Sequence, residues 1–127
     1  MSSDGIVFGA FMPQGWKMEL STIDGAVAKW DKAVEIALLA ERLGYDSIWV
    51  YDHFHNVPRP SHEAVFECWT TMAAISQRTS TIRLGQMVGC NSYRSPGLLA
   101  KITSMIDVIS LMHGEAVLFA MPVPGSP

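Results

Sequence analysis

Residues 26–51, AVAKWDKAVEIALLAERLGYDSIWVY, decide the fold, because the hydrophobic pattern changes from one period to another within a few positions. Over residues 26–43 the pattern recurs every three or four residues, which predicts an amphipathic helix. Gly44 follows, at a place where helix ends favour a residue that adopts positive φ. Residues 47–51 are then apolar on both faces, as in a parallel strand covered by helices. The predicted helical stripe is Val27, Trp30, Val34, Ala37, Leu38 and Glu41.

The same alternation extends in both directions along the chain. It predicts the order β-α-β-α-β-α-β, and therefore a parallel α/β sheet of about four strands with three helices. The alternation of strands and helices alone does not distinguish a doubly wound sheet from a (β/α)8 barrel. The third helix is expected to bury Leu98, Leu99, Ile102, Met105, Val108 and Ile109. The other predicted segments are strands at 6–12, 81–88 and from 116, a helix at 63–78, and a helix start at Ser95-Pro96.

Composition narrows the function classes. The chain has 127 residues, enough for one domain. Its net charge of −3 does not indicate the positively charged surface that binds nucleic acid. No apolar run reaches the length needed to span a bilayer, and no basic segment precedes an apolar stretch as in a secretory signal. Cys68 and Cys90 do not form a Cys-x-x-Cys motif and are interpreted as reduced thiols. We therefore expect a cytoplasmic protein without nucleic-acid or membrane partners.

Two polar clusters follow predicted strands. Residues 52–55, Asp-His-Phe-His, come after the second strand, and residues 89–94, Gly-Cys-Asn-Ser-Tyr-Arg, come after the third. In parallel α/β proteins, functional groups lie at the carboxyl ends of the strands. Adjacent strands would bring both clusters to one edge of the sheet, which predicts a functional site there.

The residue types leave several interpretations open. His53 and His55 lie two apart, as a chelate would require, but the stiff loop that follows has no convincing ligand spacing, so no metal is predicted. A histidine beside a carboxylate can transfer protons near neutral pH. Alternatively, Asp52 caps the loop and His53 faces solvent. Cys90 has no adjacent base to activate it, and Arg94 either binds an anion or lies on the surface. No Gly-x-Gly-x-x-Gly follows the first strand, which disfavours a Rossmann site.

Three segments in their order and spacing resemble the luciferase-like monooxygenase superfamily, and within it the coenzyme F420-dependent oxidoreductases. They are AERLGYDSIWVYDHF (40–54), FECWTTMAAISQRTSTIRLGQMVGCNSYRSPGLLAK (66–101) and IDVIS (106–110). The resemblance covers about residues 1–110. It implies a (β/α)8 TIM barrel that binds a deazaflavin or flavin, exchanges hydride with a small organic substrate, and often dimerises.

The resemblance also assigns residues. It implies that Asp52 contacts the cofactor and that His53 is the catalytic acid–base or charge-stabilising group near its ring. A non-prolyl cis peptide that supports the ring is expected at Met87-Val88. Cys90 and Asn91 are expected to line the cofactor pocket, and His55 is expected to have no role.

The chain departs from this resemblance after residue 110. Relatives continue with a Gly-Gly-Arg turn, a strand and a glycine-rich loop that approaches the cofactor, whereas residues 111–127 read LMHGEAVLFAMPVPGSP. We expect residues 1–127 to form a single partial barrel domain with a divergent tail from about residue 111. The expected function is hydride transfer with coenzyme F420, impaired by truncation. The alternatives are an FMN-dependent monooxygenase and an inactive half-barrel or interaction fragment. Open strand edges also predict self-association.

Overall fold

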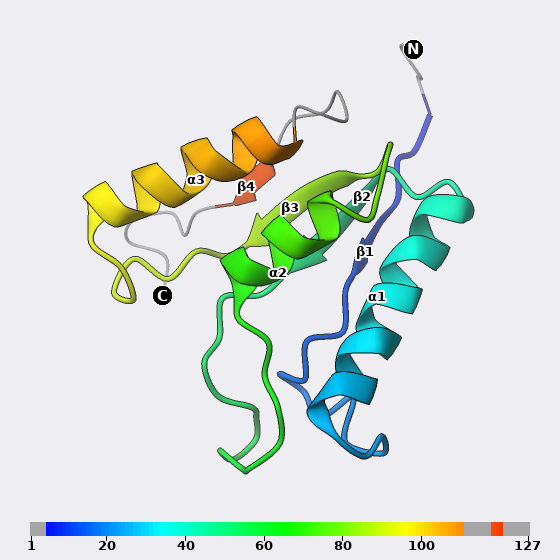
Figure 1. Cartoon of the computed structure of the whole chain (residues 1–127), viewed down its shortest axis with the longest axis vertical. Helices are drawn as coiled ribbons and strands as arrows, with labels where there is room; N and C mark the ends of the chain where they lie inside the picture. Colours follow the sequence, from blue (N-terminus) through cyan, green and yellow to red (C-terminus); the bar gives the residue numbers. More distant parts are fainter. Residues whose placement is uncertain (1–4, 111–117, 121–127) are drawn as a thin grey trace.

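The computed structural model describes residues 5–110 and the backbone of residues 118–120. Four strands form one sheet with three helices (Figure 1), in the predicted order along the chain. None of the described helices combines the length and the apolarity needed to cross a membrane. The elements are β1 (Gly9–Phe11), α1 (Ala26–Arg42), β2 (Ser47–Val50), α2 (Cys68–Ser76), β3 (Arg83–Met87), α3 (Pro96–Ser110) and β4 (Leu118–Ala120).

The sheet is parallel and its strands lie in sequential order, β1-β2-β3-β4. Its register aligns Phe11 with Trp49, Trp49 with Gly85, and Gly85 with Leu118. A helix connects each strand to the next, as in a chain of βα units. This topology places the carboxyl ends of β1, β2 and β3 at the same edge of the sheet, called the carboxyl edge below.

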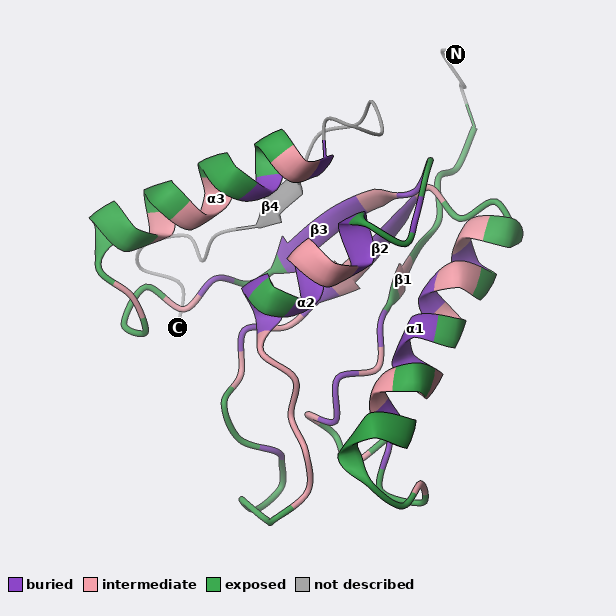
Figure 2. Ribbon diagram, viewed as in Figure 1, coloured by how far each residue is buried: buried purple, intermediate pink, exposed green. Residues whose placement is uncertain are grey.

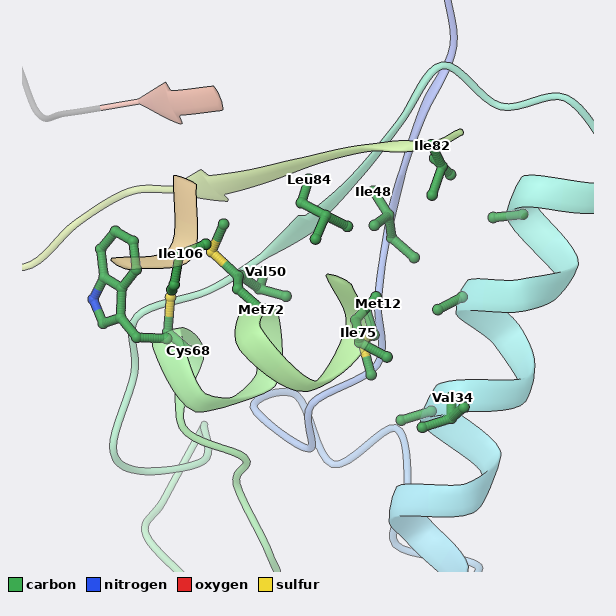
Figure 3. Packing of buried hydrophobic residues seen from close by; sticks show 14 residues of the cluster. Met12, Val34, Ile48, Val50, Cys68, Met72, Ile75, Ile82, Leu84 and Ile106 are labelled. Carbon is green, nitrogen blue, oxygen red and sulfur yellow. The ribbon is translucent and has the colours of Figure 1, made fainter. Parts of the chain in front are cut away.

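The hydrophobic core lies between the sheet and helices α1 and α2. In Figure 3 the side chains of Ile48, Val50 and Leu84 point from the strands toward Met72 and Ile75 on α2. Figure 2 shows the same distribution, with buried residues on β2 and β3 and on the facing sides of α1 and α2. Burial of these aliphatic side chains is the main source of stability for the sheet.

Two predicted stripes are partly wrong. Val27, at the start of α1, is 75 % exposed, and Lys29 and Ala33 are among the residues that the helix buries. On α3, Leu98, Met105 and Val108 are exposed; its buried residues are Ile106 and Ser110. The reason is that α3 contacts mainly α2, so that one narrow side of it is covered.

Helix α2 begins five residues later than the predicted start at Glu63. Its N-cap is Glu67, whose side chain accepts a hydrogen bond from the Thr70 N–H at 2.7 Å. The Phe66 N–H donates a hydrogen bond to the Gln14 carbonyl at 2.9 Å, and this contact holds Phe66 in an extended conformation. The Gln14 side chain also donates to the carbonyls of Phe66 (3.0 Å) and Tyr51 (3.1 Å). Tertiary pairing thus prevents residues 63–66 from extending the helix.

Trp49 lies flat on the face of the sheet that points away from the helices. Side chains alternate along a strand, so Trp49 projects opposite to Ile48 and Val50. A Cβ atom on Gly9 would lie 2.7 Å from the indole nitrogen of Trp49, and one on Gly85 would lie 2.5 Å from its ring. The indole therefore occupies space above both neighbouring strands, and it donates to the Ser47 hydroxyl at 2.9 Å.

Glu41 of α1 holds the turn that leads into β3. Its Oε1 accepts hydrogen bonds from three successive main-chain N–H groups, those of Ser80 (2.7 Å), Thr81 (2.6 Å) and Ile82 (3.0 Å). Burial alone raises the pKa of Glu41, but these hydrogen bonds outweigh it and lower the pKa below the usual 4.5.

We expect this carboxylate to make stability depend on acidity. Because the folded pKa of Glu41 lies below its unfolded value, the unfolded chain binds more protons between the two values. The stabilisation is thus complete above pH 4.5 and is lost as the pH falls through the folded pKa. Urea denaturation followed by circular dichroism between pH 3 and pH 7 should show a shallower acid slope for Glu41→Gln. An unchanged slope would contradict this assignment.

Candidate active site

The segments that leave β2 and β3 meet at the carboxyl edge, as the sequence predicts. They enclose a cavity of about 390 Å³. Five of the six residues proposed from the sequence line it, and Met87, at the end of β3, is not among the lining side chains. The cavity is lined by Asp52, His53, Val88, Gly89, Cys90, Asn91, Ser92 and Tyr93.

Asp52 is the most buried charged group of the site, with 1 % of its side chain exposed. Its Oδ2 accepts a hydrogen bond from the Cys90 N–H at 2.9 Å. Arg94 donates two further hydrogen bonds, from Nη1 to Oδ2 at 2.7 Å and from Nη2 to Oδ1 at 2.9 Å. Charge-assisted, two-pronged pairs of this kind have a fixed geometry. Asp52 therefore ties the exit of β2 to the exit of β3.

Arg94 also joins this pair to α2. Its Nη2 donates to Glu67 Oε1 at 2.6 Å, and its own side chain is 9 % exposed. The hydrogen bonds to Asp52 raise the pKa of Arg94, against the opposing effect of burial, and Glu67 adds to the rise. Burial alone raises the pKa of Glu67, but hydrogen bonds from the Thr70 main chain and from Arg94 leave it lowered. Arg94 and Glu67 are therefore both charged at neutral pH.

His53 is held by aromatic contacts. Its ring stacks on Trp16 with centroids 4.1 Å apart and planes 7° apart, and Tyr51 lies at 6.3 Å. Burial lowers the pKa of His53, and the nearby Asp52 carboxylate opposes this shift without cancelling it. The imidazole is therefore neutral at pH 7, where it can both donate and accept a proton.

A second aromatic pair connects the two exit segments. Phe54 and Tyr93 stack with centroids 4.0 Å apart and planes 11° apart, and the Arg94 guanidinium lies 6.0 Å from the Phe54 ring. A larger cavity of about 580 Å³ shares Asp52 and Cys90 with the first one. Residues 89–91 thus line both cavities.

The peptide bond between Met87 and Val88 is cis, which confirms the expectation for this position. Both side chains remain accessible, at 38 % for Met87 and 46 % for Val88. His55 is exposed and does not line the cavity. Within the part of the chain that the structure describes, no group of three or more His, Cys, Asp or Glu side chains is arranged to hold a metal ion.

Sequence reasoning missed several residues that build this site. Glu67, Trp16 and Gln14 were not proposed as site residues. For Arg94 the sequence allowed two interpretations, an anion-binding residue or an exposed surface residue. The signal for Arg94 was its position in a proposed site, two residues before Pro96. The pairing itself spans 42 positions, which no local pattern reveals.

The sequential parallel strands and the cavity at their carboxyl edge define the N-terminal portion of a (β/α)8 TIM barrel. Comparison with known proteins agrees. The chain belongs to the luciferase-like monooxygenase family, whose sequence profile matches residues 7–111. The F420-dependent glucose-6-phosphate dehydrogenase of Amycolatopsis mediterranei (strain U-32) is 33 % identical over 88 residues, which are 67 % of this chain and 25 % of that protein. The chain spans about a quarter of the length of the curated relatives that it matches.

Solved structures with the same fold include both cofactor types. The FMN complex of the oxygenating constituent of 3,6-diketocamphane monooxygenase from Pseudomonas putida has a TM-score of 0.67 at 15 % identity, covering 96 % of this chain and 31 % of that one. An F420-dependent secondary alcohol dehydrogenase in complex with an F420-acetone adduct has a TM-score of 0.66 at 23 % identity, covering 91 % and 31 %. Solved structures with this fold therefore include an F420-dependent dehydrogenase and an FMN-bound monooxygenase.

Proposed function

We propose that this chain forms the cofactor side of an F420-dependent oxidoreductase, which moves hydride between the deazaflavin and a small organic substrate. The observation that supports the proposal most is the cavity at the carboxyl edge, where His53, Val88, Cys90 and Asn91 meet over a buried Asp52. The F420-dependent relative, at 33 % identity, favours the deazaflavin over FMN.

The residues at this edge fit a flat, partly polar ring. Met87 and Val88 present accessible apolar side chains beside the cavity, and apolar contact is what most ligand pockets supply. Cys90 and Asn91 add polar groups at its wall. The volume of about 390 Å³ lies within the roughly 300–1,000 Å³ that small-molecule sites occupy. When bound, the deazaflavin supplies or accepts the hydride.

Each side chain has a separate task in this proposal. His53, neutral and fixed by Trp16, holds or releases a proton beside the substrate. Asp52 belongs to the cofactor-binding set, and it supports the cavity wall through the Cys90 N–H. Met87 and Val88 provide the apolar surface, and Asn91 offers an amide that can both donate and accept hydrogen bonds.

The proposal extends to partners and setting. We propose a cytoplasmic protein that self-associates through the outer edges of β1 and β4, because an edge strand presents unpaired main-chain groups to a neighbouring chain. The relatives are about four times longer than the matched region, so we expect the 127-residue chain alone to bind cofactor weakly and to show no measurable turnover.

The test is a titration of the 15N-labelled chain with coenzyme F420, and separately with FMN, followed by NMR. We expect F420 to shift the resonances of His53, Cys90 and Asn91 with an affinity weaker than micromolar, and FMN to shift them less. His53→Ala should reduce binding, whereas the matched variant His55→Ala should not, because His55 lies outside the cavity. Shifts with FMN alone would favour the monooxygenase, and no shift with either cofactor would favour a catalytically inactive interaction module.

A further inference from the structure

Arg94 is the cation that neutralises the buried carboxylate of the site. Its guanidinium contacts Asp52 through both oxygens, and the third hydrogen bond reaches Glu67. We propose that Arg94 is a positioning residue: by pairing with Asp52 it fixes the Cys90 main chain at the cavity wall and leaves His53 beside a neutralised carboxylate. The inference concerns the site of the proposed function, but it depends only on side chains of this chain.

The geometric part of the argument rests on three elements that meet at one guanidinium. Asp52 follows β2, Glu67 caps α2, and Arg94 belongs to the segment between β3 and α3. Asp52 Oδ2 accepts from both Arg94 and the Cys90 N–H, at 2.7 and 2.9 Å. The planar fork of an arginine can hold both carboxylate oxygens at once, which a lysine ammonium cannot do. The orientation of Asp52, and with it the place of Cys90, therefore depends on the fork.

The electrostatic part concerns His53, which follows Asp52 directly. A carboxylate beside an imidazole favours the protonated form, and its effect grows where solvent is excluded. Arg94 places a positive charge on both oxygens of that carboxylate, which reduces the effect on the imidazole. This balance agrees with the lowered pKa of His53, where burial exceeds the opposing effect of Asp52.

Other titratable groups lie around the imidazole and are part of the same balance. Tyr51, directly after β2, lies 6.3 Å from the His53 ring, and burial, together with Glu19, raises the pKa of Tyr51. Lys17 lies 5.0 Å from the Trp16 ring on which His53 stacks. From the β3 exit, Cys90 and Tyr93 line the same cavity. None of these groups contacts Asp52 as Arg94 does, through two charged hydrogen bonds.

The test compares Arg94→Met, Arg94→Lys and the control Arg78→Met in the full chain without cofactor. Arg78 is an exposed arginine next to the end of α2, away from the carboxyl edge. NMR titration of the His53 imidazole should show a raised pKa in Arg94→Met, because Asp52 is then uncompensated. Arg94→Lys should keep the pKa close to that of the unsubstituted chain, and so should Arg78→Met. Adding Asp52→Asn to Arg94→Met should reverse the rise.

The second measurement separates geometry from charge. The Cys90 and Asn91 amide resonances should move in both Arg94 variants, because neither methionine nor lysine replaces the fork. F420 affinity should fall about tenfold in both, as expected for the loss of roughly one well-placed hydrogen bond. An unchanged His53 pKa in a folded Arg94→Met chain would overturn the proposal.

If Arg94→Met fails to fold, the single variant Asp52→Asn decides the electrostatic part, since removing the carboxylate should lower the His53 pKa further. No change in that variant, or unmoved Cys90 resonances in Arg94→Lys, would also overturn the inference. Because the pKa and the amide shifts are read without cofactor, a failure here is distinguishable from a failure of the proposed F420 function.

Discussion

Gly15→Ala is expected to destabilise the chain by about 3–5 kcal/mol, a large part of the roughly 5–15 kcal/mol that stabilises an ordinary domain. Gly15 has a φ of +93°, a conformation that costs a residue with a Cβ atom roughly 1–2 kcal/mol. A Cβ atom would also lie 2.0 Å from the Ala64 carbonyl oxygen, which is main chain and cannot move alone. The Gly15 N–H donates to Glu19 at 2.8 Å, so the loop is held on its other side.

Gly25→Ala is the control, because Gly25 also has a positive φ but has free space at the position of a Cβ atom. Gly25 has a φ of +82°, and nothing lies within 4 Å of the position of its Cβ atom. This variant should therefore cost only the conformational part, about 1–3 kcal/mol. Urea denaturation followed by circular dichroism measures both. Equal losses in the two variants would show that the contact between Gly15 and Ala64 is not as close as the structure has it.

Asp52→Ala is the second substitution with a large expected effect. Among the residues that the structure describes, it would leave the Arg94 guanidinium, which is 9 % exposed, paired only with the partly exposed Glu67. Breaking a buried ion pair from one side typically costs about 3–5 kcal/mol, because an uncompensated charge remains inside the protein. The Cys90 N–H loses its acceptor as well. We therefore expect a large drop in the urea midpoint.

Two comparisons make this prediction specific. The double variant Asp52→Ala, Arg94→Met should recover part of the loss, since no unpaired charge is then buried. Lys32→Ala removes half of the exposed pair between Lys32 and Glu35 and should cost less than about 1 kcal/mol. A loss for Asp52→Ala as small as that for Lys32→Ala would mean that the Asp52–Arg94 pair adds little to stability.

Much of the fold could be predicted because its signals are local. The period of residues 26–43 gave α1 to within one residue at its end, and Gly44 has a φ of +80°, as its place after a helix suggested. Ser95 and Pro96 begin α3, where the Leu98 N–H donates to the Ser95 hydroxyl at 3.3 Å. The start of α2 was predicted wrongly because the extended state of Phe66 depends on Gln14, 52 positions away.

The candidate site, too, has features that the sequence predicts and features that it does not. That His53 and Cys90 would lie at one edge followed from strand order, since parallel neighbours end together. That Asp52 would be buried against a guanidinium did not follow, because its partner lies 42 positions further on. The stacking of Trp16 on His53 was equally hidden, as it joins the loop after β1 to the segment after β2. Contacts between distant segments depend on the packed fold, and a linear pattern carries no record of them.

Trp49 has a consequence for how this sequence can change over evolutionary time. One indole covers two neighbouring strands, so it excludes every side chain larger than hydrogen at Gly9 and Gly85 while it stays in this position. Mutations at the two glycines are therefore conditional: they become tolerable only after position 49 has accepted a smaller residue. If residue 9 or 85 is enlarged first, its side chain clashes with the indole of Trp49. A larger residue at position 9 or 85 therefore requires that Trp49 is replaced first. Substitutions at the three positions are evolutionarily coupled.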